Sequence, residues 1–146
     1  NLRSVPPSSD LLFRVGIAHP LGTKSEGEFL GAARKCLLST GEMLERITAL
    51  DHNKRLEFKV EKTPPCMTEM NPLYEIQPAH LTGYFTCETG EFRLKPLPNG
   101  DTLLEGASRY SFRIYPAPYW ALWTDHIVEQ THQVVMNEIK RRAEMP

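Results

Sequence analysis

The sequence predicts an α+β fold, in which a curved antiparallel sheet of about six strands wraps around one long C-terminal helix. Two observations lead to this prediction. Between residues 12 and 114, apolar and polar side chains alternate in several short segments separated by turn signals; from residue 118 onward, apolar side chains recur at helical spacing. The sheet then has one apolar face and the helix one apolar stripe, and each buries its apolar side against the other.

The first half of the chain supplies the early strands. Residues 12–19 alternate in polarity and are predicted to form the first strand, whereas residues 22–29 are polar, contain glycines and make weak strand material. Residues 32–39 are expected to pair with residues 43–50 across the turn "STGE". Residues 55–62, "RLEFKVEK", alternate most regularly and form the next strand.

Residues 63–80 interrupt the alternation. They contain four prolines and no sustained periodicity, so they predict a long connection. Long loops are uncommon in compact domains and often act as lids or binding loops. The sequence leaves two interpretations open, a lid over a binding site and an inert surface excursion.

The strand pattern resumes over residues 83–97, with a predicted kink at residues 88–90. Phe85 and Phe92 cannot share a face of one regular strand, because side chains alternate with a period of two. A bulge or a tight turn between them places both aromatic rings on the same side of the sheet.

The dipeptide Asn99-Gly100 predicts a hairpin that leads into a return strand over residues 102–114. One side of that strand carries Leu104, Gly106, Ser108, Tyr110 and Phe112. The small side chains of Gly106 and Ser108 leave space unfilled next to Tyr110, which favours a cavity on this side. The alternative is that Tyr110 simply fills the core, with its hydroxyl satisfied by a partner.

The last element is a helix that begins near Pro118, a residue suited to the first helical position. About 27 residues at about 1.5 Å each make a helix of roughly 40 Å. Its apolar stripe consists of Trp120, Trp123, Thr124, Ile127, Val128, Thr131, Val134 and Val135. These side chains are either plain core or the wall of a cavity. His126 and His132 are expected on the solvated surface of the helix, and Glu138 is expected to pair with Arg142, four residues further on.

Composition limits the functions to be considered. The chain has 146 residues, with 17 basic and 18 acidic side chains and a net charge of −1. This balance gives no electrostatic reason to expect a nucleic acid or an anionic membrane as partner. No apolar run approaches the roughly 18 residues of a membrane span, and no signal peptide is visible.

Catalytic and metal-binding motifs are absent from the sequence. Cys36, Cys66 and Cys87 make an odd count without CxxC spacing, so we expect reduced thiols in a cytoplasmic setting rather than disulfides or a zinc site. There is no GxSxG, no HExxH and no glycine-rich phosphate loop. We therefore predict no metal and no cofactor, and we assign no catalytic residue.

Several segments carry a resemblance to a known superfamily. "GEFRLKPLPNGDTLLEG" followed by "YPAPYWALWTDHIVEQTHQVVMNEIKRRAE", together with "HLTGYFTCETGEF", resembles proteins of the SRPBCC superfamily of the polyketide cyclase/dehydrase-like type. The resemblance covers roughly residues 12–144. It implies a START-like helix-grip fold and a small apolar, lipid-like or aromatic polyketide-like ligand between sheet and helix.

The chain departs from that pattern at its beginning. The superfamily usually has a first strand and two short helices before the segment that corresponds to "LLFRVGIAHP". Without that strand, its neighbours present unpaired backbone groups. We expect residues 12–19, a second copy of the chain in a homodimer, or a strand upstream of Asn1 to cover the gap.

The predicted cavity has a defined set of lining residues. They are Arg34, Cys36, Phe58, Val60, Tyr84, Ser108, Tyr110, Phe112, Trp120, Trp123 and Ile127. Arg34 is a polar handle only if its strand face points inward, and the opposite register places it in solvent. Three functions remain open: a binding protein for a small hydrophobic ligand, a polyketide cyclase/dehydratase-type enzyme, and a non-catalytic interaction domain with a filled core.

Overall fold

The computed structural model describes Val5 and residues 11–69, 73–74 and 82–145. Its elements in chain order are α1 (Leu11–Arg14), β1 (Pro20–Ser25), β2 (Ala33–Leu38), β3 (Gly41–Asp51), β4 (Arg55–Lys62), β5 (Phe85–Pro96), β6 (Thr102–Phe112) and α2 (Ala117–Ala143). The strands form one antiparallel sheet of six in the order β1-β2-β3-β4-β5-β6. The predicted α+β class is therefore confirmed.

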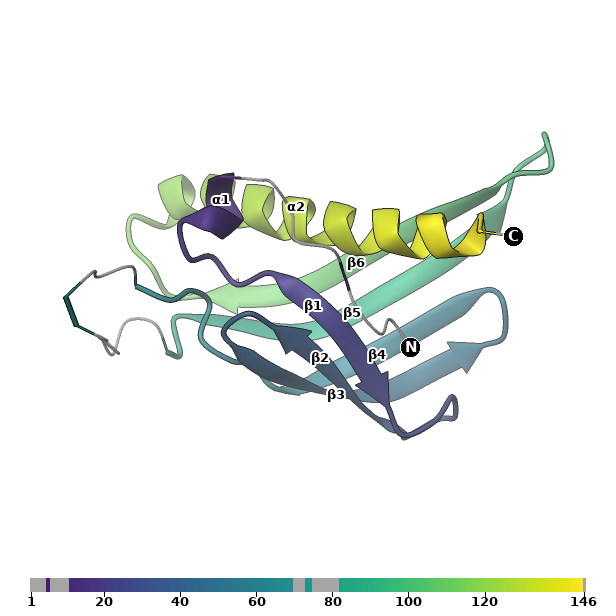
Figure 1. Cartoon of the computed structure of the whole chain (residues 1–146), viewed down its shortest axis with the longest axis horizontal. Helices are drawn as coiled ribbons and strands as arrows, with labels where there is room; N and C mark the ends of the chain where they lie inside the picture. Colours follow the sequence, from purple (N-terminus) through teal and green to yellow (C-terminus); the bar gives the residue numbers. More distant parts are fainter. Residues whose placement is uncertain (1–4, 6–10, 70–72, 75–81, 146) are drawn as a thin grey trace.

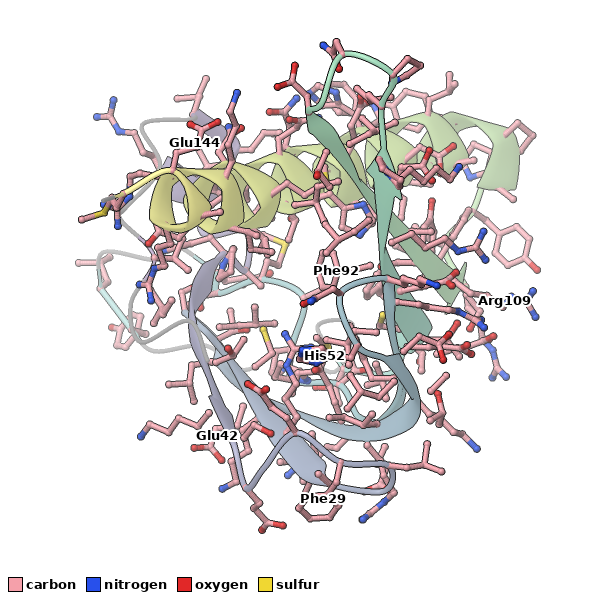
Figure 2. All side chains as sticks on the ribbon, turned by 90° about the vertical axis from the view of Figure 1, so that its right-hand side faces the viewer. Phe29, Glu42, His52, Phe92, Arg109 and Glu144 are labelled. Carbon is pink, nitrogen blue, oxygen red and sulfur yellow. The ribbon has the colours of Figure 1, made fainter. Side chains whose placement is uncertain are left out.

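The sheet curls into a half-barrel, and α2 lies lengthwise across its open side (Figure 1). Seen from one end, the strands surround an interior into which Phe92 and His52 point, while Glu42 and Arg109 point outward (Figure 2). The curl has a local cause, because strand pairing is irregular at several points, including Leu44/Glu45 and Ile47/Ala49. Such bulges bend a strand and increase its twist.

The kink predicted in the fifth strand is confirmed. The pairing of β5 with β6 shifts register between Cys87 and Thr89. Because of this shift, Phe85 and Phe92 face the same interior, which a regular strand with its alternating side chains would not allow. The Asn99-Gly100 hairpin is confirmed as well, with Gly100 at a φ of 88°.

The strand predicted for residues 12–19 is wrong. Residues 11–14 form the short helix α1, Gly16 adopts a φ of 96°, and only Ile17 makes an isolated bridge, to Met67. Glycine adopts this left-handed conformation without the steric cost that other residues incur, and here it breaks the extended run. The alternation of apolar residues in this segment therefore reflects burial of Phe13 and not a sheet pairing.

The first strand of the sheet is instead β1, in a segment that the sequence marked as weak strand material. Its polar residues suit a strand at the edge of a sheet, and Pro20 stands at its first position, where no ladder hydrogen bond is lost. Pairing with β2 supplies the stability that the local sequence lacks. Within the described residues, β1 and β6 are the two edges of the sheet.

The interior between the sheet and α2 is loosely filled. Among the described residues of α2, only Glu138 is buried, and the large side chains at its N-terminal end remain partly exposed. In the described parts of the chain, the buried apolar side chains are few: Val5, Phe13, Ala32, Ile47, Phe58 and Val60. The helix therefore covers the sheet without packing against its whole length.

Candidate ligand-binding cavity

A cavity of about 280 Å³ lies between the curled sheet and residues 120–135 of α2. Its helix wall uses one side of α2 at the helical repeat, with Trp120, Trp123, Ile127 and Thr131. Its sheet wall comes from all six strands, β1 to β6. One wall is the apolar side of α2 and the other is the inner face of the sheet. The residues that form the core therefore also line an open space.

Most of the predicted lining residues meet in this cavity. Those on its wall are Arg34, Cys36, Phe58, Ser108, Tyr110, Trp120, Trp123 and Ile127. Three others lie elsewhere. Val60 is buried beside its cross-strand partner Glu45, Tyr84 precedes β5 and is largely exposed, and Phe112 pairs with Phe85 at the end of β6. A ligand contact of any of these residues remains a prediction.

Arg34 points inward and forms an ion pair with Glu45, its direct partner across the β2–β3 ladder. Arg34 Nε lies 3.4 Å from Glu45 Oε2, and the two side chains are only 12% and 1% exposed. The guanidinium also lies over the ring of Phe58, 4.9 Å from its centroid. Burial raises the pKa of Glu45 to about 7, although Arg34 favours its ionised form.

Sequence reasoning missed Glu45, although a signal was present. Glu45 stands between Met43 and Ile47 on one side of its strand, and both of those neighbours are apolar. A carboxylate on an apolar side requires a partner, and Arg34 is the residue that the strand pairing places opposite it. The two charges together explain why each tolerates burial.

His132 also lies on the cavity wall, which corrects the prediction that it belongs to the solvated helix surface. Its Nε2 shares a hydrogen bond of 2.8 Å with Oγ of Ser108 on β6. Desolvation lowers the pKa of His132, so the neutral ring predominates at neutral pH. The side of α2 that faces the sheet therefore includes a polar residue, His132, next to its apolar residues, and this residue has a hydrogen-bond partner on β6.

Tyr110 reaches from β6 to α2, where its hydroxyl donates a hydrogen bond to Oδ1 of Asp125. Its ring packs against Phe85 with a centroid distance of 5.4 Å. Desolvation, followed by the hydrogen bond to Asp125, raises the pKa of Tyr110 to about 12. The hydroxyl of Tyr110 thus connects β6 with α2, while its ring lines the cavity.

Two cysteine thiols face the same space. Cys36 and Cys87 line the cavity, and burial raises the pKa of their thiols to about 12 and about 11. Both are free cysteines and stay protonated at neutral pH. They therefore act as small apolar wall residues and not as nucleophiles.

The loop after β4 contributes its first residues to the wall, from Thr63 to Met67. Backbone hydrogen bonds hold this stretch to the segment before β1: Ala18 N–H donates to Cys66 C=O, and Thr68 N–H donates to Gly16 C=O. The predicted lid comprised residues 63–80; residues 70–72 and 75–80 of it lie outside the described residues. The lid remains a prediction.

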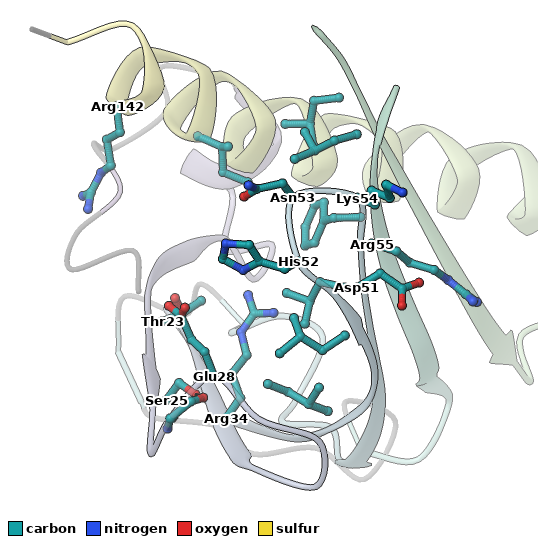
Figure 3. A pocket seen from close by; sticks show the side chains of 18 residues that line it. Thr23, Ser25, Glu28, Arg34, Asp51, His52, Asn53, Lys54, Arg55 and Arg142 are labelled. Atoms are coloured by element: carbon teal, nitrogen blue, oxygen red, sulfur yellow. Dashed lines mark hydrogen bonds between the residues drawn. The ribbon is translucent and has the colours of Figure 1, made fainter. Parts of the chain in front are cut away.

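A second, wider hollow of about 480 Å³ opens at the other end of the sheet, beside the C-terminal end of α2. His52, from the β3–β4 turn, and Arg34 both point into it, and Arg142 lies at its rim (Figure 3). The two spaces share Thr23, Arg34 and Phe92 in their walls. The Arg34–Glu45 pair therefore lies where an apolar cavity meets a polar, open mouth.

In the parts of the chain that the structure describes, no three His, Cys, Asp or Glu side chains gather as ligands of a metal ion would. None of the described helices is long and apolar enough to cross a membrane. Comparison of the chain with protein-family models, with curated proteins and with solved structures finds no match. The arrangement of a curled six-stranded sheet and a long C-terminal helix is helix-grip-like.

Proposed function

We propose that this chain is a binding protein for a small, mostly apolar molecule held between the sheet and α2. The observation that supports it most directly is the cavity of about 280 Å³, whose wall combines Trp120, Trp123 and Phe58 with a few polar groups. Ligand sites are typically concave, mainly apolar and provided with a small number of placed polar side chains. The proposal includes membership of the SRPBCC superfamily, which rests on the sequence resemblance and on the helix-grip-like arrangement.

The exposure of the tryptophans supports an unfilled interior. Trp120 is 36% and Trp123 45% exposed, although both lie on the side of α2 that faces the sheet. A large apolar side chain left partly uncovered on an inward face gains stability when an apolar ligand covers it. The volume argues against the third function considered, an interaction domain with a filled core.

A fluorescence titration tests this proposal. N-phenyl-1-naphthylamine, a neutral apolar dye that brightens in apolar surroundings, is expected to bind saturably to the full chain. Ile127→Trp fills the cavity from the helix wall and is expected to weaken dye binding at least tenfold. Leu122→Trp adds the same ring at an exposed position of the same helix and serves as the matched control. Absence of saturable binding, or equal affinity of both variants, contradicts the proposal.

A second candidate is an enzyme of the polyketide cyclase/dehydratase type that uses the same cavity. It is favoured by titratable groups with perturbed pKa values on the wall: Glu45, whose pKa is raised to about 7, and His132, whose pKa is lowered. A carboxyl group with a pKa of about 7, as at Glu45, exchanges its proton near neutral pH. Mass spectrometry of a linear polyketone incubated with the protein distinguishes the two functions, because an enzyme releases a cyclised or dehydrated product and a binding protein returns the compound unchanged.

A further inference from the structure

Two buried polar atoms in the cavity have no hydrogen-bond partner among the described residues. They are Nη1 of Arg34 and Oε2 of Glu45, one a donor and the other an acceptor. The ion pair does not satisfy them, because the 3.4 Å from Arg34 Nε to Glu45 Oε2 is long for a charge-assisted hydrogen bond. Buried polar groups are nearly always paired in folded proteins, so each exception requires an explanation.

The described side chains around the pair supply no other partner. The ring of Phe58 covers one face of the Arg34 guanidinium. The neighbouring wall includes Cys36, whose thiol is a weak donor, apolar side chains such as Met43 and Phe92, and Thr23, whose hydroxyl is not hydrogen-bonded to either orphaned atom. Both Arg34 and Glu45 border the open space itself. A bound molecule is therefore the partner that the geometry provides for.

Charge narrows the chemistry of that molecule. Arg34 and Glu45 already compensate each other, so an anion that approaches Arg34 is repelled by Glu45, and a cation that approaches Glu45 is repelled by Arg34. A neutral group that accepts from Arg34 and donates to Glu45 satisfies both orphaned atoms without adding charge to the interior.

A hydroxyl group meets this requirement with a single atom. The donor and the acceptor belong to adjacent side chains, so they are best bridged by one small group. A trans secondary amide directs its N–H and C=O in opposite directions, and a primary amide leaves a further N–H unpaired. An ether accepts but does not donate.

We propose, building on the ligand-binding function above, that the cavity selects a neutral, hydroxyl-bearing apolar molecule, an alcohol or a phenol. Its oxygen accepts a hydrogen bond from Nη1 of Arg34, and its O–H donates to Oε2 of Glu45. The apolar body of the molecule lies toward Trp120 and Trp123, and the hydroxyl lies at the boundary of the two hollows. The ion pair thereby acts as a recognition element and not as a stabilising contact.

Displacement of N-phenyl-1-naphthylamine from the full chain tests this inference with three probes that share one ring system. 2-Naphthol donates and accepts, 2-methoxynaphthalene only accepts, and 2-naphthoate is an anion. At pH 8, where the Glu45 carboxyl with its pKa of about 7 is mainly ionised, 2-naphthol is expected to displace the dye at a concentration at least tenfold lower than the other two. Tenfold corresponds to about 1.4 kcal/mol. Equal displacement by 2-methoxynaphthalene, or stronger displacement by 2-naphthoate, overturns the inference.

A pair of double variants assigns the preference to these side chains. Arg34→Met with Glu45→Leu removes both orphaned atoms together and leaves no unpaired charge, so the fold is expected to remain. The preference for 2-naphthol over 2-methoxynaphthalene should then fall to within about twofold, and a preference that persists contradicts the inference. Lys35→Met with Glu42→Leu removes an exposed ion pair from the same two strands and should leave the preference unchanged.

The outcomes separate this inference from the function on which it rests. Dye binding without any hydroxyl preference leaves the apolar binding site in place and overturns only the role of Arg34 and Glu45. Failure of both the dye and 2-naphthol to bind, the latter by calorimetry, overturns both. The comparison of the three probes uses the unaltered chain, so it decides the question even if the Arg34/Glu45 double variant fails to fold.

Discussion

Replacing Gly90 with alanine tests how the sheet makes room for the ring of Phe58. Gly90 lies opposite Phe58 in the β4–β5 ladder, and the ring covers the space where a side chain would be. A Cβ built on Gly90 would lie 2.6 Å from Cε2 of Phe58 and still closer to its Cζ. Because carbon atoms do not approach so closely, the ring has to move.

The expected cost follows from two opposing terms. Forcing an additional methyl group into a packed core destabilises by about 1–3 kcal/mol, while the loss of glycine flexibility in the unfolded chain returns about 0.4–1 kcal/mol. Phe58 is only 7% exposed and lies between Phe92 and Arg34, so its ring can yield only toward the cavity that it borders. We expect Gly90→Ala to lower the free energy of unfolding by about 1–2 kcal/mol.

Gly106→Ala on the neighbouring strand is the matched control. There the added Cβ would lie 3.3 Å from Sδ of Met136, the flexible end of a side chain, and at ordinary distances from Phe92. Its stability should stay within about 0.5 kcal/mol of the wild type. Urea unfolding followed by tryptophan fluorescence measures both variants. Equal stability of Gly90→Ala and Gly106→Ala would refute the placement of the Phe58 ring over Gly90.

Four further outcomes are expected. The pKa of Glu45 is raised from 4.5 to about 7, so between these two pH values the folded state keeps a proton that the unfolded chain has released; wild-type stability should therefore fall by about 3 kcal/mol relative to Glu45→Gln as pH rises through this window in urea titrations, and parallel curves contradict it. Tyr110→Phe removes the hydroxyl that donates a hydrogen bond to Asp125 and should lower the free energy of unfolding by about 1 kcal/mol in the same assay, whereas Tyr119→Phe at an exposed position should leave it unchanged. Arg141 and Arg142 lower the pKa of Glu138 to about 2, so Glu138→Gln should melt below the wild type at pH 7, and the gap should close as pH falls from about 4.5 to about 2. The two sheet edges, β1 and β6, lead us to expect a homodimer in sedimentation velocity, and a monomer at all concentrations would remove that prediction.

The parts of the fold that local sequence determines were predicted well. Alternation defined the strands from β2 to β6, the parity of Phe85 and Phe92 located the irregularity in β5, and the helical repeat defined α2. Each of these inferences uses side chains that are neighbours along the chain. The failure at residues 12–19 has the same origin, because alternation reports a buried side and does not report whether a neighbouring strand is available.

The polar part of the candidate site depends on pairings that a single strand does not reveal. The inward direction of Arg34 follows from its register opposite Glu45, and His132 enters the wall through its bond to Ser108 on another element. Taken one at a time, a glutamate and a histidine are expected in solvent. Glu45 and His132 are recognised as interior residues only when their partners on another strand or on the helix are known.

The order of the strands also bears on how the molecule assembles. Each strand of the sheet pairs with its neighbour in the chain, so the whole sheet is a succession of hairpins with short loop closures, apart from the longer connection between β4 and β5. Contacts between segments close in sequence form quickly, because little chain entropy is lost in bringing them together. On a ribosome all six strands emerge before α2, because the helix follows them in the chain. Until α2 packs against the sheet, the concave apolar surface is open to water and accessible to an apolar molecule from the side that the helix later covers (Figure 1).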